Sequence, residues 1–77
     1  MNKSLYLKEY ELYDGEAFVT FNIWELNETK NEISVVVTNR GKITMVTYSL
    51  LEDNKGLYFE YGPDYTKLYI NDFKEVK

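Results

Sequence analysis

Residues 16–26 constrain the fold more than any other segment, because they alternate strictly and both alternating sets contain large apolar side chains. One set comprises Ala17, Val19, Phe21 and Ile23, and the other comprises Phe18, Thr20, Asn22, Trp24 and Leu26. A period of two is that of a β-strand, in which successive side chains point to opposite faces of a sheet. We therefore predict a central strand with the first set in the core. Its second face would be covered by a curled sheet, the chain terminus or a partner.

Turn-forming residues divide the rest of the chain into further runs of strand length. Gly, Asn, Asp and Pro cluster at residues 14–15, 27–31, 39–41, 53–56 and 62–64, and these residue types favour turns. The runs between them predict strands at 32–38, 42–51, 57–61 and 68–70, and a less regular strand at 5–13 with a bulge near Lys8 and Glu9. Within 42–51 the apolar face changes near Met45 and Val46, which predicts a bulge or a bend.

The connections between these runs are short, which limits the topology. Parallel neighbours need crossovers of about a dozen residues or more, so strands joined by such loops form an antiparallel meander. We predict an all-β fold in which residues 1–77 form a single domain and five to six strands curl into a small barrel. A small β-sandwich is the alternative. Residues 71–74 predict a short helical turn at the carboxyl end, with Phe73 folded back as a lid.

Composition limits what stabilises such a small domain. The 77 residues include no Cys and no His, which excludes disulfides and zinc sites of the Cys/His type. Aromatic residues make up 17% of the chain and provide the apolar area that the core needs. Residues 1–9 lack the apolar run of a secretory signal, and no run approaches the length of a membrane span. We therefore expect a cytoplasmic protein.

Few residues suit catalysis. The commonest general base, His, is absent, and the four glycines form no phosphate-binding pattern. Paired carboxylates, such as Glu9 with Glu11, could act as catalytic acid and base, and Asp53 with Asn54 could bind a cation. We interpret these residues instead as solvated strand and turn residues. We expect a protein that is not an enzyme and that requires no cofactor or metal.

The aromatic residues support two functional hypotheses. The first is a protein-binding face, because Tyr and Trp are enriched as anchors at interfaces. Its candidate residues are Phe18, Trp24, Leu26, Tyr58, Tyr61 and Tyr69. Its partner would be a host protein or a second copy in a homodimer. The alternative is a barrel that stacks single-stranded nucleic acid on the same three tyrosines, although the net charge of −4 disfavours contact with phosphates. A third interpretation is that these tyrosines fill the core with their hydroxyls at its wet rim.

Three phrases of the sequence resemble a known group of proteins. They are EAFVTFNIWEL at 16–26, VTNRGKI at 37–43 and YFEYG at 58–62. In this order they are similar to small uncharacterised accessory proteins of conjugative elements and prophages in Gram-positive bacteria. The resemblance implies an accessory or host-interaction role for a protein of a mobile element, and it implies no catalytic residues.

Overall fold

The computed structural model describes residues 8–75. These residues form β1 (Lys8–Tyr13), β2 (Phe18–Asn27), β3 (Glu32–Asn39), β4 (Lys42–Ser49), β5 (Leu51–Asp53), β6 (Gly56–Tyr61), β7 (Thr66–Tyr69), a 3-10 turn η1 (Ile70–Asp72) and β8 (Lys74–Glu75). The prediction of an all-β fold with a short helical turn near the carboxyl end is confirmed for this part of the chain. Residues 8–75 contain no helix that is long and apolar enough to cross a membrane.

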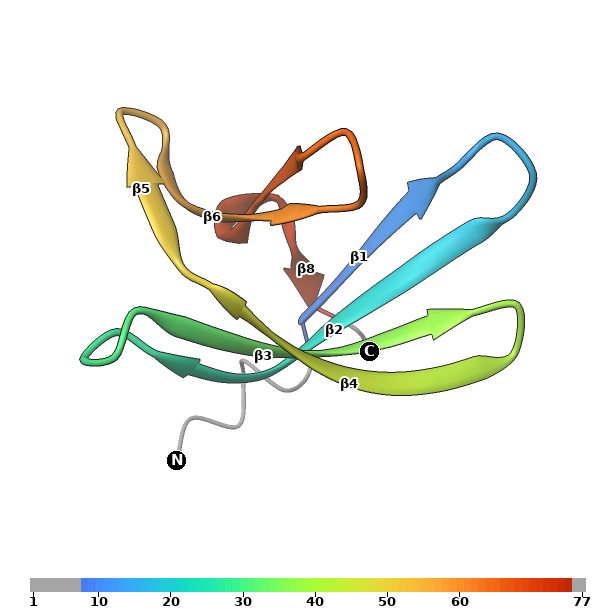
Figure 1. Ribbon diagram of the computed structural model, residues 1–77, viewed down its shortest axis with the longest axis horizontal. Helices are drawn as coiled ribbons and strands as arrows, with labels where there is room; N and C mark the ends of the chain where they lie inside the picture. The colour runs from blue at the N-terminus through green and yellow to red at the C-terminus, as the bar shows by residue number, and fades with distance from the viewer. Residues whose placement is uncertain (1–7, 76–77) are drawn as a thin grey trace.

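The strands form two antiparallel sheets that lie one above the other (Figure 1). The larger sheet has the order β4-β3-β2-β1-β8, and the smaller one has the order β5-β6-β7. Consecutive strands pair with each other within each sheet, as in a meander, and β8 returns to pair with β1. The predicted closure into a barrel is not observed among residues 8–75, where each sheet keeps two edge strands.

Leu50 lies where the chain leaves the larger sheet for the smaller one. β4 ends at Ser49 and β5 begins at Leu51. The side chain of Leu50 is buried in the core, and its amide donates a 2.8 Å hydrogen bond to the carbonyl of Asn31. The bend predicted near Met45 and Val46 therefore occurs at Leu50. The pairing of β4 with β3 runs through Met45 and Val46 without a shift, so the change of apolar face there reflects a strand with apolar residues on both faces.

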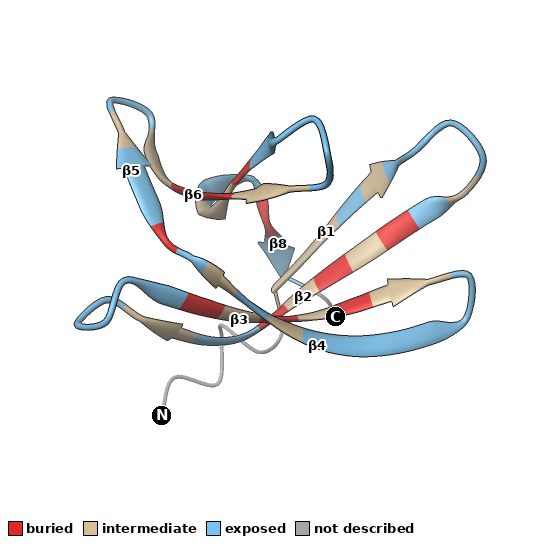
Figure 2. Cartoon of the chain, in the orientation of Figure 1, coloured by how far each residue is buried: buried red, intermediate tan, exposed pale blue. Residues whose placement is uncertain are grey.

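The core fills the space between the two sheets. Its buried residues come from β2 and β3, from the smaller sheet, and from two positions outside the strands: Val19, Phe21, Ile23, Ile33, Val35, Val37, Leu50, Phe59, Leu68 and Phe73. The ring of Phe59 is stacked 4.8 Å from that of Tyr48, and it lies 6.2 Å from both Phe21 and Phe73. The predicted inward face of β2 is confirmed for Val19, Phe21 and Ile23, and Phe73 is buried in the core cluster as expected. Figure 2 shows buried segments on β2, β3 and β6.

One extra residue interrupts the pairing of β2 with β3. The register shifts between Ile23, which lies opposite Val35, and Glu25, which lies opposite Ser34, so that Trp24 is the extra residue of β2. This is a β-bulge, and a shift of one residue reverses the face on which all later side chains lie. Leu26 consequently returns to the core side, where it packs against the buried cluster. The prediction that Leu26 shares a face with Phe18 and Trp24 is therefore wrong.

The regularity of β1 also differs from the prediction. Glu9 to Tyr13 pair with β2 without a register shift, so no bulge occurs at Glu9. The predicted strand residues 5–7 lie outside the described residues. The loop at Asp14 and Gly15 closes the hairpin of β1 and β2. The hairpin of β3 and β4 turns at Arg40 and Gly41. Both of the latter have positive φ, 54° and 82°, as a two-residue turn between twisted strands requires.

Candidate functional site

The larger sheet has an outer face, which points away from the smaller sheet and carries exposed apolar side chains. Side chains alternate along a strand, so the neighbours of the buried residues point outward. Four of these outward residues are at least half exposed: Tyr13 (57%), Phe18 (57%), Ile43 (70%) and Met45 (51%). Together with the partly buried Val36, we call them the outer patch. Trp24, at the bulge, is also exposed.

Tyr13 and Phe18 form the end of the outer patch that lies on β1 and β2. They are directly opposite each other in the register, and their ring centroids are 5.1 Å apart. The hydroxyl of Tyr13 donates a 3.1 Å hydrogen bond to the carbonyl of Gly15. In the same loop, the Asp14 carboxylate accepts 2.9 Å hydrogen bonds from the amides of Glu16 and Ala17, which hold the pKa of Asp14 below its ordinary value. The loop between β1 and β2 thus positions this aromatic pair.

Ile43 and Met45 form the other end of the outer patch, on β4. Met45 lies opposite Val36, and the polar pair Ser34 and Thr47 lies beyond them, with 3.0 Å between the two hydroxyl oxygens. At the other end of these strands, the hairpin turn carries Arg40, which forms an ion pair with Glu16 of the loop between β1 and β2. The apolar side chains are thus bordered by polar groups, as at many interaction surfaces.

Tyr58 and Tyr69 lie on the face of the smaller sheet that points away from the core. They are directly opposite each other, and their ring centroids are 5.2 Å apart. The Tyr69 hydroxyl donates a 2.6 Å hydrogen bond to Asp53, and Lys67 Nζ lies 3.3 Å from the same carboxylate and 4.7 Å from the centroid of the Tyr58 ring. The bond between Tyr69 and Asp53 lowers the pKa of Asp53 and raises that of Tyr69. These groups satisfy one another within the sheet.

Tyr61 lies on the opposite face of the smaller sheet. Its ring meets that of Phe21 edge-on at 4.8 Å, and it packs against the core. Tyr58 is only 9% exposed. The structure therefore does not bring the predicted interaction residues together. Phe18 and Trp24 are exposed, Leu26 and Tyr61 pack against the core, and Tyr58 and Tyr69 pair with each other.

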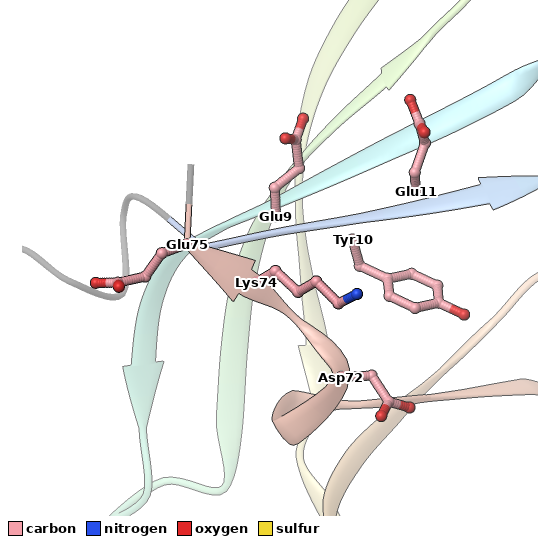
Figure 3. A pocket seen from close by; sticks show the side chains of 6 residues that line it. All are labelled: Glu9, Tyr10, Glu11, Asp72, Lys74 and Glu75. Atoms are coloured by element: carbon pink, nitrogen blue, oxygen red, sulfur yellow. The ribbon is translucent and has the colours of Figure 1, made fainter. Parts of the chain in front are cut away.

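A recess of about 370 Å³ lies beside β1 and β8 (Figure 3). It is lined by Glu9, Tyr10, Glu11, Asp72, Lys74 and Glu75. Figure 3 shows Glu9 and Glu11 on one side of β1, with Tyr10 and Asp72 on the other, and Glu75 pointing away. Within residues 8–75, no three acidic side chains converge to hold a metal ion. Glu9 and Glu11 therefore do not form a joint site with Asp72.

Sequence reasoning missed Tyr13, Ile43 and Met45 as candidate residues. The only available signal was that Ile43 and Met45 alternate with Val46 and Tyr48, so one of the two sets had to face away from the core. The deciding fact, that Ile43 and Met45 share the outer face with Thr38 and Val36, depends on the pairing of β4 with β3. No protein-family model, curated protein or solved structure matches the chain.

Proposed function

We propose that this chain is a non-enzymatic protein-binding module and that the outer patch is the surface that binds. The observation that supports it is the position of Tyr13, Phe18, Ile43 and Met45. They are exposed on one face of a sheet whose opposite face packs against the core. The two apolar pairs are separated by Thr20 and Thr38 of the same face, and exposed apolar side chains with such polar neighbours mark sites of protein interaction. An accessory role in a conjugative element or prophage belongs to the same proposal.

The aromatic pair Tyr13 and Phe18 is the expected centre of the binding energy. Burial of one large apolar side chain is worth about 1.5–3 kcal/mol, and aromatic anchors dominate many interfaces. The two rings pack on each other, and the Tyr13 hydroxyl is bonded to Gly15. Side chains that are already ordered lose less entropy on binding.

The alternative, stacking of single-stranded nucleic acid on the tyrosines, has less support. Tyr58 is nearly covered, Tyr61 packs on Phe21, and the ammonium of Lys67 is paired with Asp53. A groove that follows a nucleic-acid backbone needs cations that are available to phosphates, and the chain carries a net charge of −4.

The proposal is tested by affinity capture from a host lysate with immobilised wild-type protein and with Phe18→Ser. The matched control is Tyr65→Ser, which removes a 70% exposed aromatic ring that is not part of the outer patch, from the loop between β6 and β7. We expect a protein that is enriched on the wild type and on Tyr65→Ser but lost on Phe18→Ser. Equal enrichment on all three would exclude the outer patch, and turnover of a substrate in an activity screen would contradict the non-enzymatic proposal.

A further inference from the structure

β4 is the longest unpaired edge in the described residues. It has eight residues, whereas the other edge strands, β8, β5 and β7, have two, three and four. Residues 42–46 of β4 are exposed in all but one position, and Figure 2 shows this strand as exposed over most of its length. An edge strand presents a row of unpaired N–H and C=O groups, to which another strand can bind.

The edge of β4 lacks the features that prevent such pairing. Natural edge strands are protected by charges, proline, bulges or short length. β4 contains no proline, its pairing with β3 is regular, and its one charge, Lys42, lies at its first residue. The opposite edge, β8, consists of the charged residues Lys74 and Glu75. The contrast between the two edges of one sheet indicates that the edge of β4 pairs with a strand of another chain.

We propose that β4 pairs with β4 of a second copy of this chain, antiparallel and around a two-fold axis perpendicular to the sheet. The two five-stranded sheets would become continuous. This inference rests on the proposed function, because it assigns an occupant to the part of the outer patch that Ile43 and Met45 form.

The sequence of β4 is complementary to itself in this arrangement. With the axis at Met45, near the centre of the strand, Met45 lies beside its own copy, and Ile43 lies beside Thr47 of the second copy. Opposite residues of an antiparallel pair share a face, so the outward apolar side chains of both copies form one cluster. The Lys42 side chains lie at opposite ends of the paired strands and do not meet.

Charge also favours β4 over the opposite edge. The chain has a net charge of −4, so two copies repel each other in general. The recess beside β8 is lined by four carboxylates and one ammonium, which makes that edge unfavourable for self-pairing. Residues 43–49 are uncharged, so β4 is an edge where two copies meet without repulsion between acidic groups.

The size of the contact determines the expected strength of the dimer. One paired strand and its outward side chains bury less than the roughly 1,200–2,000 Å² of a stable interface. We therefore expect a reversible dimer that dissociates on dilution.

The test combines sedimentation velocity with charge variants at one position. Wild-type protein should show a mass that rises with concentration towards that of a dimer. Met45→Lys and Met45→Glu place like charges beside each other across the axis, so each variant alone should dimerise at least tenfold more weakly. An equimolar mixture of the two should dimerise again, because opposite charges then meet. Met45 is half exposed, so both substitutions are compatible with the fold.

Hydrogen exchange of the wild type provides a second readout without substitutions. Every second amide of β4 should gain protection as concentration rises. The proposal is overturned by a wild type that stays monomeric, by Met45 variants that dimerise like the wild type, or by a mixture that does not recover. Phe18→Ser should keep the wild-type dimerisation. Loss of the dimer with intact partner capture would therefore refute this inference alone, and the reverse result would refute only the proposed partner-binding function.

Discussion

The hydroxyl of Tyr69 donates a 2.6 Å hydrogen bond to Oδ2 of Asp53, and this bond joins the two edge strands of the smaller sheet across β6. Lys67 lies 3.3 Å from the same oxygen. The backbone amide of Lys55 donates to the other carboxylate oxygen, at 2.8 Å. The carboxylate therefore connects the hairpin of β5 and β6 to β7. The cluster of Asp53, Lys67 and Tyr69 therefore has a structural role, which is to join the strands of the smaller sheet.

Tyr69→Phe tests that role. The substitution keeps the ring, which packs 5.2 Å from Tyr58, and removes only the donor to Asp53. We expect a lower urea midpoint, because the carboxylate loses a charge-assisted hydrogen bond. Tyr65→Phe is the matched control and should leave the midpoint unchanged, since Tyr65 is largely exposed. Equal effects of the two substitutions would contradict the assigned role.

The same bond predicts how stability depends on pH. It is the main cause that lowers the pKa of Asp53. A carboxyl with a lower pKa in the folded state stabilises that state above its unfolded pKa, near 4, and this contribution is lost as the pH falls through the folded pKa. The wild type should therefore lose stability in acid, and Tyr69→Phe should lose less. Asp14 retains its own lowered pKa in the variant, so the acid dependence should decrease without disappearing.

At alkaline pH, the dependence of stability on pH has the opposite sign. The bond to Asp53 raises the pKa of Tyr69, and the bond between Asp53 and Lys67 raises that of Lys67. A group with a raised folded pKa stabilises the folded state fully below its unfolded pKa, near 10 for both side chains, and the contribution is lost as the pH rises through the folded value. Urea midpoints measured from pH 7 upward should fall for the wild type and fall less for Tyr69→Phe.

Phe59 is the residue on which packing between the sheets depends most. It is fully buried, and its ring is near those of Phe21, Tyr48 and Phe73. Phe59→Ala should cost about 3–5 kcal/mol, which approaches the roughly 5 kcal/mol expected for so small a domain. We expect this variant to be largely unfolded by near-ultraviolet circular dichroism. Phe18→Ala removes an exposed ring and should cost less than about 1 kcal/mol. Similar losses of stability for Phe59→Ala and Phe18→Ala would show that the packing between the sheets does not depend on Phe59.

The sequence predicts the local parts of this fold well, because they depend on neighbouring residues. Alternation in 16–26 and 32–38 anticipates β2 and β3, and Arg40 and Gly41 anticipate the turn between β3 and β4. The division into two sheets is different, because it depends on Leu50. That residue is one apolar position among several in a continuous β pattern, and only its burial and its bond to Asn31 make it the point where the sheets separate.

The candidate surface is predicted only in part, for a similar reason. Phe18 lies on an exposed face as the alternation indicates. Tyr58 and Tyr69 look like free aromatic side chains in the sequence, but the register places them opposite each other and beside Lys67 and Asp53. Pairing between strands that are distant in sequence determines which aromatic rings remain available, and alternation within one strand contains no information about it.

Deletion of single residues from β2 tests the bulge. The bulge consists of one extra residue at Trp24, so deletion of Trp24 leaves a one-to-one pairing in which Ile23 and Leu26 still face the core. We expect a variant that unfolds cooperatively and loses about 1 kcal/mol or less. Deletion of Asn22 is the control. It also removes the extra residue, but it turns Ile23 outward and forces Trp24 into the core, so it should cost at least about 2–5 kcal/mol. Urea denaturation followed by circular dichroism compares the two, and an equal loss would show that the register of β2 depends on Trp24 itself.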